Sequence, residues 1–216
     1  AYDRWWEGRK LWGKLVNDTR YLAIKISSIL PVERVADRQF FMEMIGNVSF
    51  ATKEHLRDSI LISELSLPDE TLRKKVIASS HRPNKLADAL FERTHQLYKE
   101  HIIDGHQLYI LDKELKGFVD MIGGCERIKT TPIPFSFSMF IKKFLFIYSM
   151  TLPVSFAWQF GYWTTPIVIL TFYFLVSVEL ISEEIEDPFG EDINDLPLDE
   201  ICFKIKNNVE EIMPKK

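Results

Sequence analysis

The sequence predicts an all-α membrane protein, and three observations lead to this prediction. From Phe144 through Val178 the chain carries no Asp, Glu, Lys or Arg over 35 residues. Outside this block, apolar residues recur at spacings of three, four and seven, the pattern of helices that pack along one face. Alternating apolar and polar residues, which would predict strands, do not extend over a useful length. An apolar helical segment attached to a larger, charged helical region is therefore expected.

The charge-free block is too long for one membrane crossing, because an apolar helix needs about 20 residues to span the hydrocarbon core. Gly161 through Pro166 supplies a turn, with a Gly, two aromatic residues, hydroxyl side chains that cap helices and a Pro suited to a first helical turn. We expect a transmembrane hairpin over residues 135–183, with spans near Met139–Phe160 and Thr164–Glu183.

The alternative is a buried hairpin in the core of a soluble protein, because a helix that is apolar on every side fits either setting. Aromatic side chains occur on every face of both segments, which favours lipid. Pro153 is expected to kink the first span. In a membrane bundle, neighbouring helices can satisfy the carbonyl group that this proline leaves unbonded.

The charged parts of the chain are expected to form a helical region over residues 1–134 and a C-terminal segment over 184–216, both in the cytosol. Pro31 should end the first helix. Thr130 or Thr131 is expected to cap the helix that enters the membrane, with Pro132 at its start. Six helices are expected in the charged parts. The first two cover residues 1–30 and 33–57, and a short third helix begins at Ser66–Glu70 and stops before Ser79. The others run from Leu86 to Ile102, from Leu108 to a stop at Gly123–Gly124, and from Pro197 through Glu211.

Charged residues flank the predicted spans. Lys142 and Lys143 can extend toward lipid headgroups, and their positive charge predicts that this end of the hairpin lies on the cytoplasmic side. Glu179, Glu183 and Glu186 fall at i, i+4 and i+7, so they share one helix face where the second span leaves the bilayer. Acids in such positions usually face protein or water rather than lipid.

Composition excludes several functions. A net charge of −4 argues against binding to nucleic acid, which would favour a basic surface. Cys125 and Cys202 lie far apart without a CxxC motif, so reduced thiols are expected. The histidines show neither an HExxH motif nor pairs three or four residues apart, which predicts no metal site and no cofactor. They are His55, His81, His95, His101 and His106.

Two long stretches resemble a known family. Glu126–Phe135 (ERIKTTPIPF) and Glu186–Leu198 (EDPFGEDINDLPL) resemble the signature stretches of the bestrophins in their prokaryotic form. Ala1–Arg9 and Leu11–Gly13 resemble the helix just past the pore neck of these channels. The resemblance covers the whole chain. The signature residues are Glu126, Arg127, Thr130, Thr131, Pro132, Pro134, Phe135, Glu186, Asp187, Pro188, Phe189, Gly190, Asn194 and Asp195.

The resemblance implies a bestrophin-like homopentameric ion channel in the cell membrane. It implies passive conduction of small inorganic ions, chloride among them, through an axial pore, with the lipid bilayer and further copies of the chain as partners. It implies no enzymatic activity and no nucleic acid. The chain opens at Ala1 inside a helical pattern, so a preceding segment that carries the apolar pore neck is expected.

The resemblance also implies a second constriction at the cytosolic exit, with one residue per subunit. Counting back from Gly123 without a gap puts this aperture at His106, where other members commonly carry an aliphatic residue. Five imidazole groups around an axis could make conductance depend on pH. The alternative is a solvent-exposed His that follows a helix break at Gly105.

Eukaryotic bestrophins carry an unbroken acidic run that binds calcium. Here Ile193 and Asn194 interrupt the acids Glu191, Asp192 and Asp195, which supply few of the roughly six to eight oxygens that calcium needs. We expect a local role for these acids in turns and helix caps rather than calcium binding.

Two other functions fit part of the sequence. One is a membrane-anchored helical scaffold that does not conduct. The other is a membrane enzyme in which a divalent ion binds acids at the end of the second span, and liposome ion flux would separate a channel from both. The acids in question are Glu183, Glu184, Glu186 and Asp187.

Overall fold

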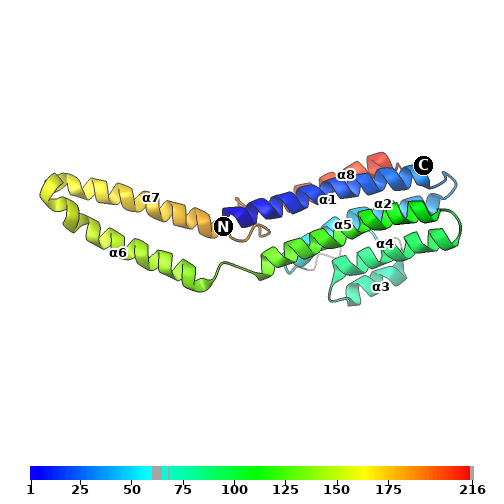
Figure 1. Ribbon diagram of the computed structural model, residues 1–216, viewed down its shortest axis with the longest axis horizontal. Helices are drawn as coiled ribbons and strands as arrows, with labels where there is room; N and C mark the ends of the chain where they lie inside the picture. The colour runs from blue at the N-terminus through cyan, green and yellow to red at the C-terminus, as the bar shows by residue number, and fades with distance from the viewer. Residues whose placement is uncertain (60–64, 68, 215–216) are drawn as a thin grey trace.

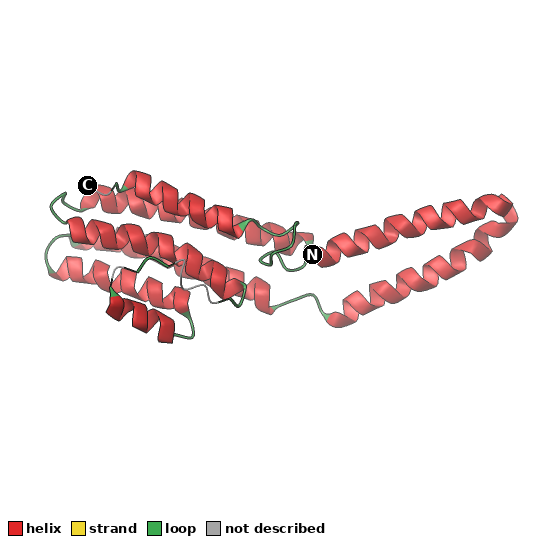
Figure 2. Ribbon diagram, turned by 180° about the vertical axis from the view of Figure 1, so that it is seen from behind, coloured by secondary structure: helices red, strands yellow, loops and turns green. Residues whose placement is uncertain are grey.

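A computed structural model describes residues 1–59, 65–67 and 69–214 of the chain. These residues form helices and no strand, which confirms the all-α prediction. Figure 1 shows an elongated molecule in which a helical bundle and a two-helix hairpin lie end to end, and Figure 2 shows it from behind. The helices are α1 (Tyr2–Ile29), α2 (Val35–Leu56), α3 (Glu70–Ala78), α4 (Arg82–Lys99), α5 (Gly105–Thr130), α6 (Phe135–Phe160), α7 (Thr164–Glu184) and α8 (Leu198–Ile212).

The core of the bundle lies between α1, α2, α4, α5 and α8. The predicted stripe of α1 is fully buried in this core at Trp12, Leu15, Leu22 and Ile26. Pro31 follows the extended residue Leu30, so the helix ends where the sequence predicted. Helices α2 and α8 also begin and end within two residues of their predicted bounds.

The start of α3 is only partly described. The Asp69 carboxylate caps this helix by accepting hydrogen bonds from the amides of Thr71, at 3.1 Å, and Leu72, at 3.3 Å. Pro68, which belongs to the predicted start signal, lies outside the described residues. The helix ends at Ala78, before Ser79 as predicted.

Helix α5 is longer than predicted, because it continues through Gly123 and Gly124 to Thr130. At Gly124 a Cβ atom would lie 3.0 Å from both methyl groups of Leu11 on α1. The glycine therefore allows α1 and α5 to approach closely, and it does not end the helix. Cys125 follows in the same buried face, and burial raises the pKa of its thiol to about 12. Cys202 is buried as well, and the two thiols are not joined to each other.

The predicted cap of the first hairpin helix was wrong. Helix α5 includes Thr130, and α6 begins at Phe135 after an extended Pro134, so neither threonine caps α6 and Pro132 lies outside it. The physical reason is that Pro132 and Pro134 disfavour helical backbone in the residue before each of them. Residues 131–134 therefore form a linker between the two helices, visible in Figure 1.

The turn of the hairpin lies where the sequence predicted. Gly161 adopts a φ of +51° that favours glycine, a short 3-10 turn covers Gly161–Trp163, and α7 begins at Thr164. One continuous helical stretch, Phe135–Glu184, is long and apolar enough to cross a membrane, and only 6% of its most apolar window is buried within the chain. The hairpin thus presents its apolar side chains outward rather than to the bundle.

Candidate functional site

The candidate site is the junction, which we define as residues 1–13 of α1 together with the signature stretches 126–135 and 186–198. These three segments meet where the bundle continues into the hairpin (Figure 1). The site therefore contains the end of α5, the linker before α6 and the loop after α7.

Arg4 is the central side chain of the junction. Its guanidinium Nε donates to the carbonyl of Glu186 at 3.1 Å, and Nη2 donates to the carbonyl of Ile128 at 2.8 Å. Nη1 donates to the carbonyl of Thr131. Because five N–H donors point outward from a rigid plane, one arginine can join α1 to both ends of the hairpin.

Further hydrogen bonds close the junction around Arg4. The indole N–H of Trp5 donates to the carbonyl of Asn194 at 2.9 Å. The amide of Ile133 donates to the carboxylate of Glu186 at 3.0 Å, which joins the linker to the end of α7. Arg127 on α5 pairs with Glu7 on α1. Each signature stretch therefore contacts the start of α1.

The loop over residues 186–198 is folded tightly. Phe189 is buried against Gly8, where a Cβ atom would lie 3.1 Å from the Phe189 ring. One carboxylate oxygen of Asp195 accepts the amide of Asp192 at 2.8 Å and leaves no room for a side chain at Gly190. Burial raises the pKa of Asp195 above its ordinary value.

Three acids of this loop, Asp187, Glu191 and Asp195, have partners within the chain. The carboxylate of Glu191 lies 3.7 Å from the Arg57 guanidinium, which also contacts Asp199 at 2.7 Å. Asp195 bonds to backbone, as described above, and Asp187 accepts the amide of Phe189 at 3.2 Å. The Asp195 contact is a turn of the kind that the sequence predicted, but no side chain among the described residues caps α8, and Glu191 forms an ion pair instead.

The acids at the base of α7 also bind within the chain instead of converging on one point. Lys142 of α6 lies 3.1 Å from Glu183 and 3.5 Å from Glu179, so the two helices of the hairpin are paired at their base. Glu184 accepts the side-chain amide of Asn194 at 2.6 Å. Glu186 is bonded to the linker.

His106 lies in the first turn of α5, and this helix begins at the end of the bundle opposite the hairpin (Figure 1). It is exposed, next to a capping box in which Asp104 and Gln107 bond to each other's backbone amides. The structure therefore places this residue far from the junction, at a tip of the molecule.

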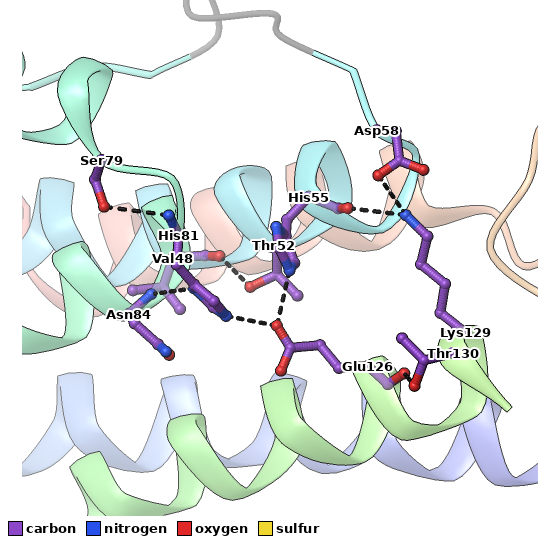
Figure 3. A network of polar contacts seen from close by, with 10 residues as sticks. All are labelled: Val48, Thr52, His55, Asp58, Ser79, His81, Asn84, Glu126, Lys129 and Thr130. Carbon is purple, nitrogen blue, oxygen red and sulfur yellow. Dashed lines mark hydrogen bonds and ion pairs between the residues drawn. The ribbon is translucent and has the colours of Figure 1, made fainter.

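Sequence reasoning missed one cluster. His55 on α2 and His81 before α4 both contact the same carboxylate oxygen of Glu126 on α5, at 2.7 and 2.5 Å (Figure 3). The expectation of scattered histidines is thus wrong for these two. Glu126 was singled out as a signature residue, but the separations along the chain gave no signal that would join it to either histidine.

The fold and the junction define an all-α membrane protein with an apolar hairpin, and comparison with known proteins identifies its family. Residues 1–211 match the family described as Bacterial/Fungal Bestrophin protein. A solved structure of a bacterial bestrophin homolog from Klebsiella pneumoniae superposes with a TM-score of 0.93 at 28% identity, over 99% of this chain and 80% of that one. The chain belongs to the bestrophin family.

Two curated relatives carry the same name. A voltage-dependent anion channel-forming protein of Nostoc sp. is 37% identical, over 98% of this chain and 70% of the relative. Its namesake in Synechocystis sp. is 34% identical, over 99% of this chain and 71% of the relative. The named relatives are channel-forming proteins and not enzymes, so the metal-dependent enzyme considered from the sequence is set aside.

Proposed function

We propose that this chain is the subunit of an anion channel in which five copies surround an axial pore. The observation that carries the proposal is an exposed apolar hairpin, fastened to a charged bundle by the residues that mark the bestrophin family. The anion-channel names of relatives up to 37% identical support the ion class.

In the proposed topology, α6 and α7 cross the membrane as a hairpin, and residues 1–134 and 184–216 lie in the cytosol. Trp158, Tyr162 and Trp163 near the turn are 96%, 100% and 74% exposed, which suits aromatic residues at a membrane interface. Lys142 and Lys143 at the other end suit the cytoplasmic side. Both ends of the chain then lie on the same side of the membrane.

The test is ion flux through the whole protein reconstituted in liposomes. Under an asymmetric sodium chloride gradient, the current should reverse near the chloride equilibrium potential, as expected if this chain shares the anion class that its relatives' names give. Subunit counting by native mass spectrometry should give five. Absence of flux from a correctly assembled protein would favour the non-conducting scaffold, and reversal near the sodium potential would reject anion selectivity.

His106 is the proposed cytosolic aperture. Its exposure at the distal tip of the bundle suits a ring of five side chains around an axis. His106→Ala should flatten the dependence of conductance on pH between mildly acidic and mildly basic solution, since the imidazole charge would be lost. Replacement of His95, an exposed histidine of α4, is the matched control. An unchanged pH profile in His106→Ala would reject this role.

A further inference from the structure

A cluster of one carboxylate and two imidazole groups lies beside the last turns of α5. His55 comes from the last turn of α2, His81 caps α4, and Glu126 belongs to α5. One ligand atom from each residue lies within 4.8 Å of the others. Figure 3 shows that both imidazole rings point toward the Glu126 carboxylate. Three separate helical elements therefore contribute one potential metal ligand each.

We propose that His55, His81 and Glu126 bind a transition-metal dication, with Zn²⁺ as the probe, and thereby fasten α2, α4 and α5 together. Imidazole nitrogen favours zinc and similar metals, whereas calcium and magnesium prefer sites built of oxygen alone. Three protein ligands leave a fourth position of a tetrahedral zinc for water.

The geometry is close to what zinc requires. Zinc–nitrogen distances of about 2.0–2.1 Å in a tetrahedron separate the ligand atoms by roughly 3.4 Å. The two nitrogens now lie 2.7 and 2.5 Å from Glu126 Oε1, and the imidazole rings are 4.5 Å apart between centroids. A metal ion would enter if the flexible Glu126 side chain withdrew by less than about 1 Å, which its rotamers permit.

The backbone around the ligands is already fixed. Lys129 donates to the carbonyl of His55 at 3.2 Å and pairs with Asp58 at 2.7 Å, so its charge is offset beside the cluster. The amide of His81 donates to the hydroxyl of Ser79 at 3.2 Å. The side chains of the cluster remain about 30% exposed, which gives an ion access from solvent. A prepositioned and accessible ligand set favours binding.

Binding has a defined effect on the His81 proton. The amide of Asn84 donates to His81 Nδ1 at 3.2 Å, which places the proton of a neutral ring on Nε2, where it bonds to Glu126. Coordination of a neutral ring through Nε2 requires the proton on Nδ1, so the amide of Asn84 would lose this acceptor. Protonated imidazole cannot bind metal, so affinity should fall in acid. Beside the cluster, the charges of Lys129 and Asp58 offset each other in an ion pair of 2.7 Å.

The test is zinc binding by calorimetry to the whole protein in detergent. One Zn²⁺ per chain should bind, and His55→Ala, His81→Ala and Glu126→Gln should each weaken the affinity at least tenfold. Glu126→Gln retains a side-chain oxygen that accepts both ring N–H groups, so it tests the ligand without emptying the cluster. His95→Ala, which removes an exposed histidine of the same α4 helix, should leave the affinity unchanged.

A thermal scan provides the second measurement. Zinc should raise the melting temperature of the wild type more than that of Glu126→Gln at the same zinc concentration, since tighter binding to the folded state alone stabilises it more. Wild-type affinity and stoichiometry in a folded His55→Ala/His81→Ala double variant would overturn the proposal, as would absence of zinc binding to the wild type. Neither measurement uses ion flux, so either failure leaves the proposed channel function intact.

Discussion

The bundle and the hairpin use the same residue types in opposite surroundings. Trp12 in α1 is fully buried, whereas Trp158 in α6 is 96% exposed. The bundle gathers its apolar side chains in stripes that face one core, and the hairpin distributes them over its whole surface. The difference shows that water organises the bundle through the hydrophobic effect, while the hairpin requires an apolar environment outside the chain.

The largest expected effect tests this contrast directly. Trp12→Ala should lower the free energy of unfolding of the bundle by about 3–5 kcal/mol, because it leaves a cavity in a packed core. Trp158→Ala should change it by less than about 0.5 kcal/mol, because this side chain is 96% exposed. Denaturant unfolding in detergent, followed by circular dichroism, measures both. Similar losses of unfolding free energy in the two variants would contradict the contrast between a packed bundle core and an exposed hairpin.

The second prediction places a charge in each region. Ile147→Arg, at a position 61% exposed in the middle of α6, should cost about 2.5–3.5 kcal/mol of membrane insertion and reduce the protein recovered in membranes. Tyr109→Arg changes a residue that is 70% exposed on α5 and should not affect recovery. Membrane fractionation with an alkaline wash measures the outcome. Equal recovery of both variants would argue against the hairpin as the inserted part.

The sequence predicted the two regions well because each follows from the spacing of apolar residues. In the bundle these residues recur periodically, and in the hairpin they fill the charge-free block. The stripe from Trp12 to Ile26 and the charge-free block required no knowledge of neighbours. The turn at Gly161 was equally local, since few residues other than glycine adopt its positive φ. Interactions between residues close together in the sequence therefore determine these helices and the hairpin.

What the sequence could not predict depended on contacts between distant segments. Gly124 looked like a helix terminator, yet it lies inside α5 because Leu11 of α1 needs the space of a missing side chain. His55, His81 and Glu126 meet only because α2, α4 and α5 pack together. The signature residues were recognised from resemblance, but the role of Arg4 as their common partner appears only in the fold.

The third prediction concerns the junction that joins the two regions. Arg4→Ala should lower the free energy of unfolding by about 2 kcal/mol, because two partly buried carbonyl groups and one exposed carbonyl group lose a charged donor. Arg4→Lys should recover only part of this, since an ammonium group cannot reproduce the planar fork. Lys10→Ala, an exposed cation on the same helix, is the control. If Lys10→Ala lowered the free energy of unfolding as much as Arg4→Ala, Arg4 would not be the side chain that holds the junction together.

The smallest expected effect is the change in the bundle's stability in acid. The Asp199 carboxylate of α8 accepts hydrogen bonds from Lys53 of α2 at 2.8 Å and from Arg57, the residue after α2, at 2.7 Å. Burial raises the pKa of Asp199, but the hydrogen bonds from Lys53 and Arg57 outweigh burial and leave the pKa below its ordinary value of 3.8. A lowered pKa in the folded state stabilises the bundle above pH 3.8, and this contribution is lost as the pH falls through the folded-state value.

Asp199→Asn should therefore lower the free energy of unfolding by on the order of 1 kcal/mol near neutral pH, since half of the side chain is exposed and solvent screens the pair. The difference from wild type should shrink below about pH 4, because protonated aspartic acid and asparagine are then both uncharged. Unfolding measured from about pH 6 to about pH 3 provides the profile, with exposed Glu200→Gln as control. A difference that persists unchanged in acid would mean that Asp199 stabilises the bundle through packing and not through its charge.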